Sequence, residues 1–237
     1  SRGSLPRRSL RCVPTGTEPA IITRLRVLVV KNVTDRTHNP FGMQPDCPSF
    51  VPGYGDANAD FHVIGDHPGV HGGLEESIPF TGKSWSPALF NALAEAGLVT
   101  DADAATVNHT FFSYLHMCLP DGDPTPSSYD DMERFFDAEL RAIAAHVLLP
   151  VGARATEHVL KTYTARAWKT EIDMEALHAT ELLGSGWLVV PIRDPATWEA
   201  NDATQLVEAL RDIQSTDFRR ESDLGRFFAG NDPYLVR

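Results

Sequence analysis

Short apolar runs alternate along the chain with segments in which apolar residues recur every three or four positions. The first pattern predicts buried strands and the second predicts amphipathic helices. Strands are expected at 61–65, 105–112, 147–151 and 187–192, and helices at 86–96, 128–145, 152 to about 160, and 202–213. This alternation predicts an α/β fold, a three-layer α/β/α sandwich around a central, mostly parallel four-stranded sheet.

Two stretches near the beginning of the sequence show neither of these patterns. Residues 1–36 are irregular and basic, with eight Lys/Arg against two Asp/Glu, and are expected to be a flexible arm or a stretch upstream of the native start. Residues 38–60 are rich in Pro and Gly and are expected to form an ordered loop. We therefore predict an N-terminal arm at 1–36 and a single domain at 37–237.

The charge of the chain is strongly uneven. The net charge is −11, so residues 37–237 together carry −17. An acidic surface argues against broad, nonspecific binding to nucleic acids at low salt. The same composition, with few Lys and many Asp, Glu and Ala, is also typical of proteins adapted to a salty cytoplasm, where charges are screened.

Composition also bears on the compartment. The longest apolar run, at 27–30, is far shorter than the ~20 residues of a membrane helix, and no signal peptide follows the basic start. The three cysteines, Cys12, Cys47 and Cys118, are too few for a disulfide framework. These features predict a reduced, cytoplasmic protein without membrane contact.

The most informative stretch is the turn that follows the strand at 61–65. Its sequence, Gly65-Asp66-His67-Pro68-Gly69, places one carboxylate at the carboxyl end of a buried strand. Ligands of open α/β sheets bind at that end, and a carboxylate there can orient a water or accept its proton. Phe80 follows on a second loop, and a charge beside a flat ring suits a flat, polar ligand such as a nucleobase.

Taken in order, these motifs resemble those of the uracil-DNA glycosylase superfamily, most closely its family 4, the iron–sulfur branch. The resemblance covers roughly residues 46–212 and rests on five segments, at 51–56, 65–69, 79–82, 107–108 and 149–155. It implies a glycosylase fold and a DNA substrate from which a deaminated base is removed.

The resemblance also implies a role for individual residues. Asp66 stands where the family has a water-activating Glu, Phe80 where a ring stacks on uracil, and Asn108 where an amide reads the uracil edge. Backbone and side chains of the first turn would line the base site, namely Gly65, His67, Pro68 and Gly69. Lys83, Arg154 and Pro195 would contact DNA.

The sequence departs from the family in two places. A four-cysteine cluster needs four thiolates, and only Cys47 and Cys118 lie in suitable regions, so we expect no iron–sulfur cluster and no other cofactor. The family's last motif is His-Pro-Ser, whose His stabilises the uracil anion. Here the turn reads Arg193-Asp194-Pro195, and a carboxylate would repel that anion unless Arg193 supplies a positive charge.

Structural roles remain open for each of these residues. Asp66 can be a turn residue bonded to its own backbone, Phe80 a core residue, and Asn108 a strand-end residue that satisfies a loop. Our leading hypothesis is therefore a monomeric DNA glycosylase, and its rival is a protein of the same fold that binds a base or nucleic acid without cleaving it. A metal-dependent hydrolase that uses Asp66, His67 and His71 is a third, weaker alternative.

Overall fold

A six-stranded sheet with the order β1-β5-β2-β6-β8-β7 organises the molecule. The computed structural model describes residues 44–164 and 172–224, all of which belong to one compact unit spanning 31–237. The four central strands are parallel: β5 (Thr110–Tyr114), β2 (Phe61–Gly65), β6 (Val147–Pro150) and β8 (Trp187–Val189). The predicted α/β class and mostly parallel sheet are thus confirmed.

Two short antiparallel strands, which the pattern did not predict, complete the edges of this sheet. They are β1 (Tyr54–Gly55), which pairs with β5, and β7 (Leu182–Gly184), which pairs with β8. A separate two-stranded sheet joins β3 (Val99–Asp101) to β4 (Thr106–Val107).

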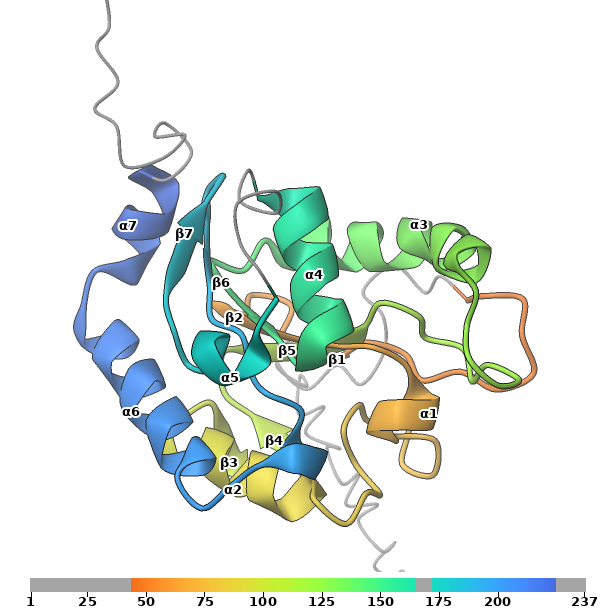
Figure 1. Ribbon diagram of the computed structural model, residues 1–237, viewed down its shortest axis with the longest axis horizontal. Helices are drawn as coiled ribbons and strands as arrows, with labels where there is room; N and C mark the ends of the chain where they lie inside the picture. Colours follow the sequence, from red (N-terminus) through yellow and green to blue (C-terminus); the bar gives the residue numbers. More distant parts are fainter. Residues whose placement is uncertain (1–43, 165–171, 225–237) are drawn as a thin grey trace, which may run out of the picture. The chain divides into compact units, whose positions relative to one another are not determined.

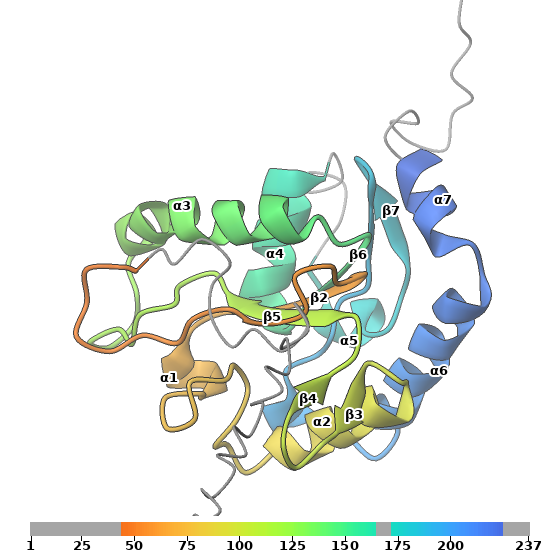
Figure 2. The same ribbon diagram turned by 180° about the vertical axis from the view of Figure 1, so that it is seen from behind.

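Helices cover both faces of the sheet, as Figures 1 and 2 show. One face carries α3 (Pro126–Ile143) and α4 (Gly152–Tyr163), and the other carries α2 (Ser86–Glu95) and α6 (Asp202–Ser215). The shorter helices are α1 (Pro68–His71), α5 (Met174–Leu177), the 3-10 turn η2 (Pro195–Thr197) and α7 (Phe218–Leu224).

The core is divided between the two faces because successive strand side chains point in opposite directions. In β2, Val63 packs into the cluster beneath α2 and α6, while Ile64 packs into the cluster beneath α3 and α4. All five residues of β2 are buried, as expected for a parallel strand covered on both faces, although one of them, His62, is polar.

The register of the parallel strands brings three chain segments to one edge. Gly65 pairs with Tyr114 and Ile64 pairs with Pro150, so β2, β5 and β6 end side by side. Asp66 and the residues that follow β5 and β6 therefore meet at the carboxyl edge of the sheet, where α/β proteins bind ligands.

The predicted strand at 105–112 is wrong in its boundaries. The strand is interrupted by a turn at Asn108 and His109, where His109 adopts a left-handed backbone with φ of 48°. This turn separates β4, which pairs with β3, from β5, which starts at Thr110 and continues to Tyr114. The β-branched pattern runs through the turn, and so it concealed the break.

The expectation of unpaired cysteines is also wrong. Cys47 and Cys118 form a disulfide with a Cα–Cα distance of 6.2 Å. It joins the loop before β1 to the segment after β5, next to an isolated bridge between Phe50 and Cys118. The pairing was missed because 71 residues separate the two cysteines in sequence.

Two further expectations concern the ends of the chain and membranes. The predicted arm at 1–36 and its boundary with the domain lie outside the described residues. Among the residues with described structure, no helix is long and apolar enough to cross a membrane.

Candidate active site at the carboxyl edge of the sheet

Asp66 leaves the end of β2 and is held by side chains from two helices. Tyr129 of α3 donates a hydrogen bond to Oδ1, and Arg154 of α4 places its Nε 3.5 Å from Oδ2. The Arg154 guanidinium also lies over the Tyr129 ring, 4.9 Å from its centroid. Burial, followed by the Asp66 carboxylate, raises the pKa of Tyr129, so this hydroxyl remains a donor near neutral pH.

The Asp66 carboxylate keeps some acceptor capacity. Each carboxylate oxygen can accept two hydrogen bonds, and Tyr129 and Arg154 occupy one position on each. The side chain is 15% exposed. It can therefore still bind a water and accept a proton from it.

His67 and His116 flank the turn that carries Asp66. His67 caps the short helix α1, because its Nδ1 accepts the Gly69 N–H at 3.1 Å. His116 Nδ1 lies 2.9 Å from the Cys118 carbonyl oxygen, and the two imidazoles meet edge to face at 6.5 Å. Burial lowers the pKa of His67, and Asp66 partly opposes this shift.

His71, at the end of α1, is almost completely buried. Its Nδ1 accepts the backbone N–H of Asp66 at 3.0 Å. Its ring lies among Phe80, Trp85 and Tyr114, with centroid distances of 5.4, 6.0 and 6.2 Å. Burial lowers the pKa of His71 to about 4, and Asp194 is the strongest of the charges that oppose this shift.

Phe80 is enclosed in this structure. Its exposed fraction is 0%, its φ is 69°, and its ring meets Phe112 and Tyr114 edge to face. The Phe80 N–H donates to the Tyr114 hydroxyl at 2.7 Å, and its carbonyl accepts from Ser86. The ring therefore lies next to the candidate site but packs as a core residue, and stacking on a base requires a neighbouring ring to move.

Tyr114 fixes two loops of the site at once. It is the last residue of β5, opposite Gly65, and its hydroxyl donates to the Gly72 carbonyl at 3.1 Å while it accepts from Phe80. Burial raises the pKa of Tyr114 well above its ordinary value, so the phenol stays neutral.

Asn108 lies at the opposite end of the sheet from Asp66. Its side-chain amide donates to the Gly97 carbonyl at 3.0 Å, and its side chain is exposed in the turn before β5. Because the five residues of β5 rise about 3.3 Å each, roughly 15 Å separate the two ends of the strand. Asn108 and Asp66 therefore do not belong to one pocket. The structure contradicts the prediction that Asn108 reads the base edge beside Asp66.

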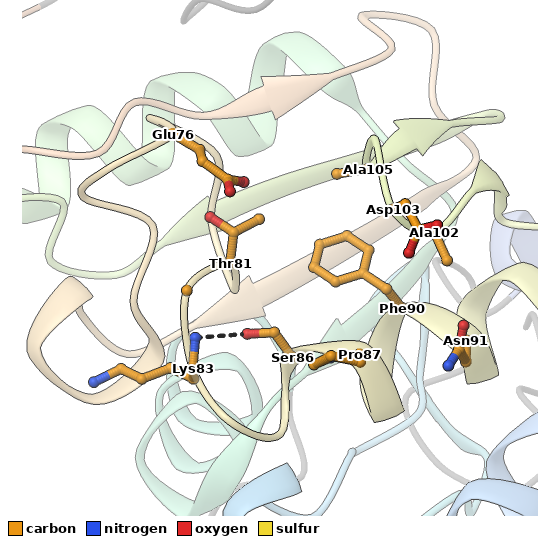
Figure 3. A pocket seen from close by; sticks show the side chains of 11 residues that line it. Glu76, Thr81, Lys83, Ser86, Pro87, Phe90, Asn91, Ala102, Asp103 and Ala105 are labelled. Atoms are coloured by element: carbon orange, nitrogen blue, oxygen red, sulfur yellow. Dashed lines mark hydrogen bonds between the residues drawn. The ribbon is translucent and has the colours of Figure 1, made fainter.

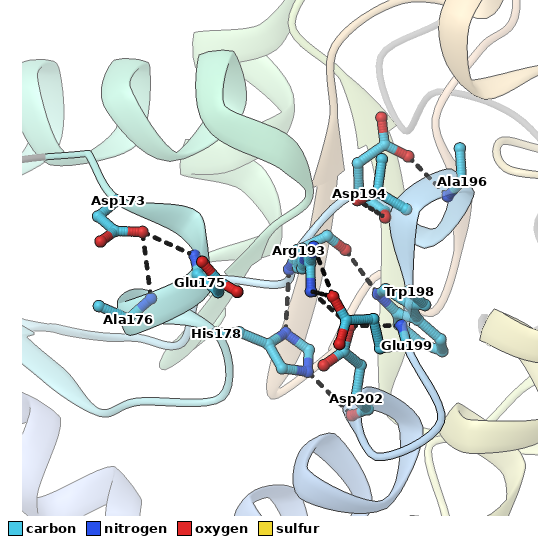
Figure 4. Close-up of polar contacts among 11 residues, drawn as sticks. Asp173, Glu175, Ala176, His178, Arg193, Asp194, Ala196, Trp198, Glu199 and Asp202 are labelled. Carbon is cyan, nitrogen blue, oxygen red and sulfur yellow. Dashed lines mark hydrogen bonds and ion pairs between the residues drawn. The ribbon is translucent and has the colours of Figure 1, made fainter.

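Arg193 does not neutralise Asp194. Figure 4 shows its guanidinium directed to Glu199 and Asp202, with N–O distances of 3.4 and 3.2 Å. Its backbone N–H donates to His178 Nδ1 at 3.0 Å. The predicted positive charge at this turn is thus engaged elsewhere.

The Asp194 carboxylate points away from Arg193 (Figure 4) and caps η2, where Oδ1 accepts the Ala196 N–H at 2.9 Å. Pro195, a predicted DNA contact, is buried as the first residue of η2. The side chain of Asp194 is half-buried. Asp194 is the first of the charges that raise the pKa of His71 against the effect of burial, so the last motif lies within electrostatic range of the first turn.

The two predicted DNA-contacting cations both reach the first turn. Lys83 Nζ donates to the Gly69 carbonyl at 2.8 Å, and Arg154 pairs with Asp66 as described. Gly65 and Pro68 contribute backbone to the same turn, and a Cβ at Gly65 would lie 2.6 Å from the Tyr114 ring. Close packing of the turn on Tyr114 thus explains the glycine.

Three pockets formed by the described residues lie near these loops, and none of the three is lined by Asp66 or Phe80. Figure 3 shows the one of about 280 Å³ on the outer side of the Phe80 loop, beside Thr81, Lys83 and Phe90. The others, of about 260 and 250 Å³, lie beside Gly69 and Lys83 and beside Tyr129 and Arg154. Space for ligands therefore flanks the Asp66 turn on both sides.

The donor set does not suit a metal ion or an iron–sulfur cluster. Within residues 44–164 and 172–224, no group of three or more His, Cys, Asp or Glu is placed to hold a metal. A four-thiolate cluster needs four cysteines, whereas this sequence has three, of which Cys47 and Cys118 are paired in a disulfide.

Sequence reasoning found Asp66 and missed most of its surroundings. Tyr129 is 63 positions away on another helix and has no local signal. Tyr114 could have been found from the end of the apolar run at 110–114, had the turn at Asn108 been recognised. His71 was considered only as a metal ligand.

Comparisons with known proteins identify a family for this chain. A family model described as the uracil DNA glycosylase superfamily matches residues 52–214. A type-5 uracil-DNA glycosylase of Pyrobaculum aerophilum is 27% identical over 172 residues, which cover 69% of this chain and 73% of that protein.

Two further relatives carry the same description. The protein of Thermus thermophilus is 29% identical over 123 residues, which cover 49% of this chain and 56% of its own length. That of Mycobacterium leprae is 27% identical over 169 residues, covering 67% and 71%. All three names specify type 5, so the expected closeness to family 4 is not supported by them.

Proposed function

The chain belongs to the uracil-DNA glycosylase superfamily, and from this premise we propose that it removes uracil or another deaminated base from DNA by hydrolysing the N-glycosidic bond. The observation that carries the proposal is the Asp66 carboxylate, which is oriented at the carboxyl edge of the sheet and keeps acceptor capacity for a water. We further propose that it acts as a monomer and needs no diffusible cofactor.

The reaction follows from this arrangement. A base flipped out of the DNA loses its stacking, which costs a few kcal/mol and favours mispaired or single-stranded sites. As the bond between C1′ and the base breaks, its electron pair leaves with the base. A water held by Asp66 adds to C1′, and its proton passes to the carboxylate. The products are an abasic site and an anionic base that takes a proton from solvent.

Contacts with DNA are proposed for the cations beside the turn. Arg154 is more than half exposed, and Lys83 lies between two of the pockets. Both now bond to the turn itself, so a phosphate would replace or share these bonds. We therefore propose that the DNA backbone runs along the two sides of Asp66.

A second candidate function is binding of a base or nucleic acid without cleavage. The observation that favours it is the enclosed Phe80 ring, together with an Asp194 carboxylate that Arg193 does not neutralise. Such a charge would oppose departure of an anionic base. This candidate retains the fold and the DNA partner and differs only in the chemical step.

One assay separates the two candidates. Single- and double-stranded DNA containing uracil or hypoxanthine is incubated with the protein at low and high salt, with and without chelator, and abasic product is counted. We expect chelator-resistant product, and a loss of roughly 10²–10⁴-fold in Asp66→Asn, the usual contribution of general acid–base catalysis.

The matched control is Asp212→Asn, which removes an exposed carboxylate of α6. It should retain the wild-type rate. Binding of both DNAs without product would favour the non-cleaving protein. Asp66→Asn with more than a tenth of the wild-type rate would exclude Asp66 as the group that activates water.

A further inference from the structure

The inference begins with the protonation of His71. Its Nδ1 accepts the Asp66 N–H, so this nitrogen carries a lone pair. In a neutral imidazole the proton then sits on the other nitrogen, Nε2. Burial keeps the ring neutral near pH 7, because the pKa of His71 falls to about 4. The Nε2–H is therefore a fixed hydrogen-bond donor.

This donor is unused. His71 is 1% exposed, and its Nε2 is buried with no hydrogen-bond partner among the described residues. Leaving a buried polar group unpaired is unfavourable, so such a group usually has a partner in the functional state. The ring is held in this orientation because the Asp66 N–H donates to Nδ1, and it packs so closely on Gly65 that an added Cβ there would lie 2.8 Å from Nδ1.

The position of the ring points to the base site. His71 lies on the turn that carries Asp66 and beside Phe80, at 5.4 Å and a tilt of 36°. The charged or titratable groups that act on it are Asp194, Asp66, His67 and Lys83, from three separate segments of the chain. His71 thus lies among the residues that the family resemblance assigns to the base and to the water.

We propose that His71 donates a hydrogen bond from Nε2 to a carbonyl oxygen of the flipped base and stabilises the negative charge that develops there as the base leaves. This inference rests on the proposed function and adds to it the residue that replaces the histidine missing from the last motif. Arg193 cannot serve, since it is bonded to Glu199 and Asp202, and an ionised Asp194 has no proton to donate.

A neutral donor suits the step. Charge moves onto the base oxygen in the transition state, and a prearranged N–H stabilises it without transferring its proton. Among the three rings around His71, Phe80 and Tyr114 are fully buried and Trp85 is half-buried. Trp85 is therefore the ring that an entering base displaces to reach Nε2.

Two substitutions of His71 separate the role of its acceptor nitrogen, Nδ1, from that of its donor nitrogen, Nε2. His71→Asn retains an acceptor for the Asp66 N–H but lacks the distant donor, whereas His71→Gln brings an amide N–H to the position of Nε2. We expect single-turnover excision of single-stranded uracil DNA to fall by roughly 10²-fold or more in His71→Asn. His71→Gln should retain at least ten times the rate of His71→Asn.

The control is His109→Asn, an exposed histidine at the opposite end of the sheet. It should leave the rate unchanged, and thermal unfolding should show all three variants to be folded. A rate for His71→Asn within threefold of wild type, or equal rates for the two His71 variants, would overturn the proposal.

A second measurement uses the wild-type protein and does not need turnover. In protein labelled with ¹⁵N-histidine, NMR should show His71 as the neutral Nε2–H tautomer at pH 7. Single-stranded DNA carrying one cleavage-resistant 2′-fluoro-deoxyuridine should shift the Nε2–H resonance of His71. A matched undamaged strand that contains neither uracil nor thymine should leave this resonance unchanged.

These results distinguish the two proposals. If the wild-type protein excises no base but the fluorinated DNA shifts the Nε2–H resonance, the proposed function fails and the His71 contact stands. A proton on Nδ1 instead of Nε2, or an unshifted Nε2–H at saturating DNA, would refute the His71 contact whatever the activity.

Discussion

At the scale of single residues, Asp194 is the group most at odds with base excision. It is half-buried, it is not paired with Arg193, and it acts directly on His71. A like charge near a departing anion in a partly buried site raises the barrier by up to several kcal/mol at an effective dielectric near ~20. On the proposed mechanism, Asp194 should therefore slow base excision, while the donor on His71 should support it.

Removing this charge is therefore expected to raise activity. Asp194→Asn keeps the cap on the Ala196 N–H, and we expect it to increase single-turnover excision of uracil by roughly 10-fold or more. Asp194→His should also exceed wild type. If His71 already supplies the donor, the histidine should gain little beyond the asparagine.

The comparison of Asp194→Asn with Asp194→His thus tests charge against donation. The control is Glu199→Gln, which removes an exposed carboxylate from the same turn and should not change the rate. Rates for both Asp194 variants at or below the wild-type rate would show that this carboxylate does not limit excision, and the non-cleaving function would become the better account.

How much of the site could be predicted depends on how locally each residue is fixed. Asp66 was predictable, because an apolar strand followed by Gly and Pro marks the end of the strand within a few residues. Arg193 was predicted as a possible countercharge, but its partners Glu199 and Asp202 become neighbours only when η2 and α6 fold. The donor on His71 depends on a backbone N–H and on burial, which no residue pattern reveals.

At the scale of elements, the apolar periodicity located the main helices and strands but not their edges. The helix predicted at 128–145 begins at Pro126, because Thr125 caps it by accepting the Ser128 N–H. The helix predicted at 86–96 has no side-chain cap, and Ser86 instead donates to the Phe80 carbonyl. Caps and short edge strands rest on tertiary contacts, so sequence patterns place them poorly.

The disulfide is the element-scale feature with the clearest test. It closes a loop across a separation of 71 residues and ties the segment before β1 to the end of β5. Loop closure of this length is expected to contribute about 4 kcal/mol in the chain-entropy model, and measured values are typically 2–4 kcal/mol. The double substitution of Cys47→Ser and Cys118→Ser should therefore lower the free energy of unfolding by about 2–4 kcal/mol.

Mass spectrometry of the non-reduced protein and urea unfolding check this prediction, with Cys12→Ser as the control that leaves the pair intact. Equal stabilities of the paired and unpaired proteins would mean that the disulfide does not form in solution.

The purified wild-type protein should also be colourless, because we expect no iron–sulfur cluster. A brown preparation with stoichiometric iron would contradict this expectation.

At the scale of the whole molecule, the layered fold followed from the alternation of elements, whereas the buried polar groups did not. His62 lies inside the sheet, with its Nε2 2.7 Å from the Ser113 hydroxyl, and burial lowers its pKa to about 3. Glu139 is fully buried against the Gly53 N–H, and burial raises its pKa to about 8. Both read in the sequence as ordinary polar positions of a strand and a helix.

These groups make stability depend on pH in a defined direction. His62 and His71 have pKa values of about 3 and 4 in the folded chain against an ordinary 6.5, so the unfolded chain binds more protons below pH 6.5 and stability falls as the pH drops. Glu139 has the opposite effect. Its pKa of about 8 against 4.5 means that the folded chain keeps a proton that the unfolded chain loses, so stability falls as the pH rises through this range.

Stability should therefore be greatest near pH 6.5 and decline on the alkaline side up to pH 8, by less than the ~1.4 kcal/mol per pH unit of a full one-proton difference, because Glu139 is partly ionised there and the histidines still act in the opposite direction. Glu139→Gln retains an acceptor for the Gly53 N–H but cannot ionise, so it should abolish the alkaline decline and leave the acid side, set by the histidines, in place. Urea unfolding from pH 4.5 to 8.5 measures both curves, with Glu157→Gln as a control on an exposed position of α4. Parallel curves of unfolding free energy for wild type and Glu139→Gln above pH 6.5 would show that Glu139 is already ionised in the folded protein. The buried carboxylate would then need a countercharge that the described residues do not supply.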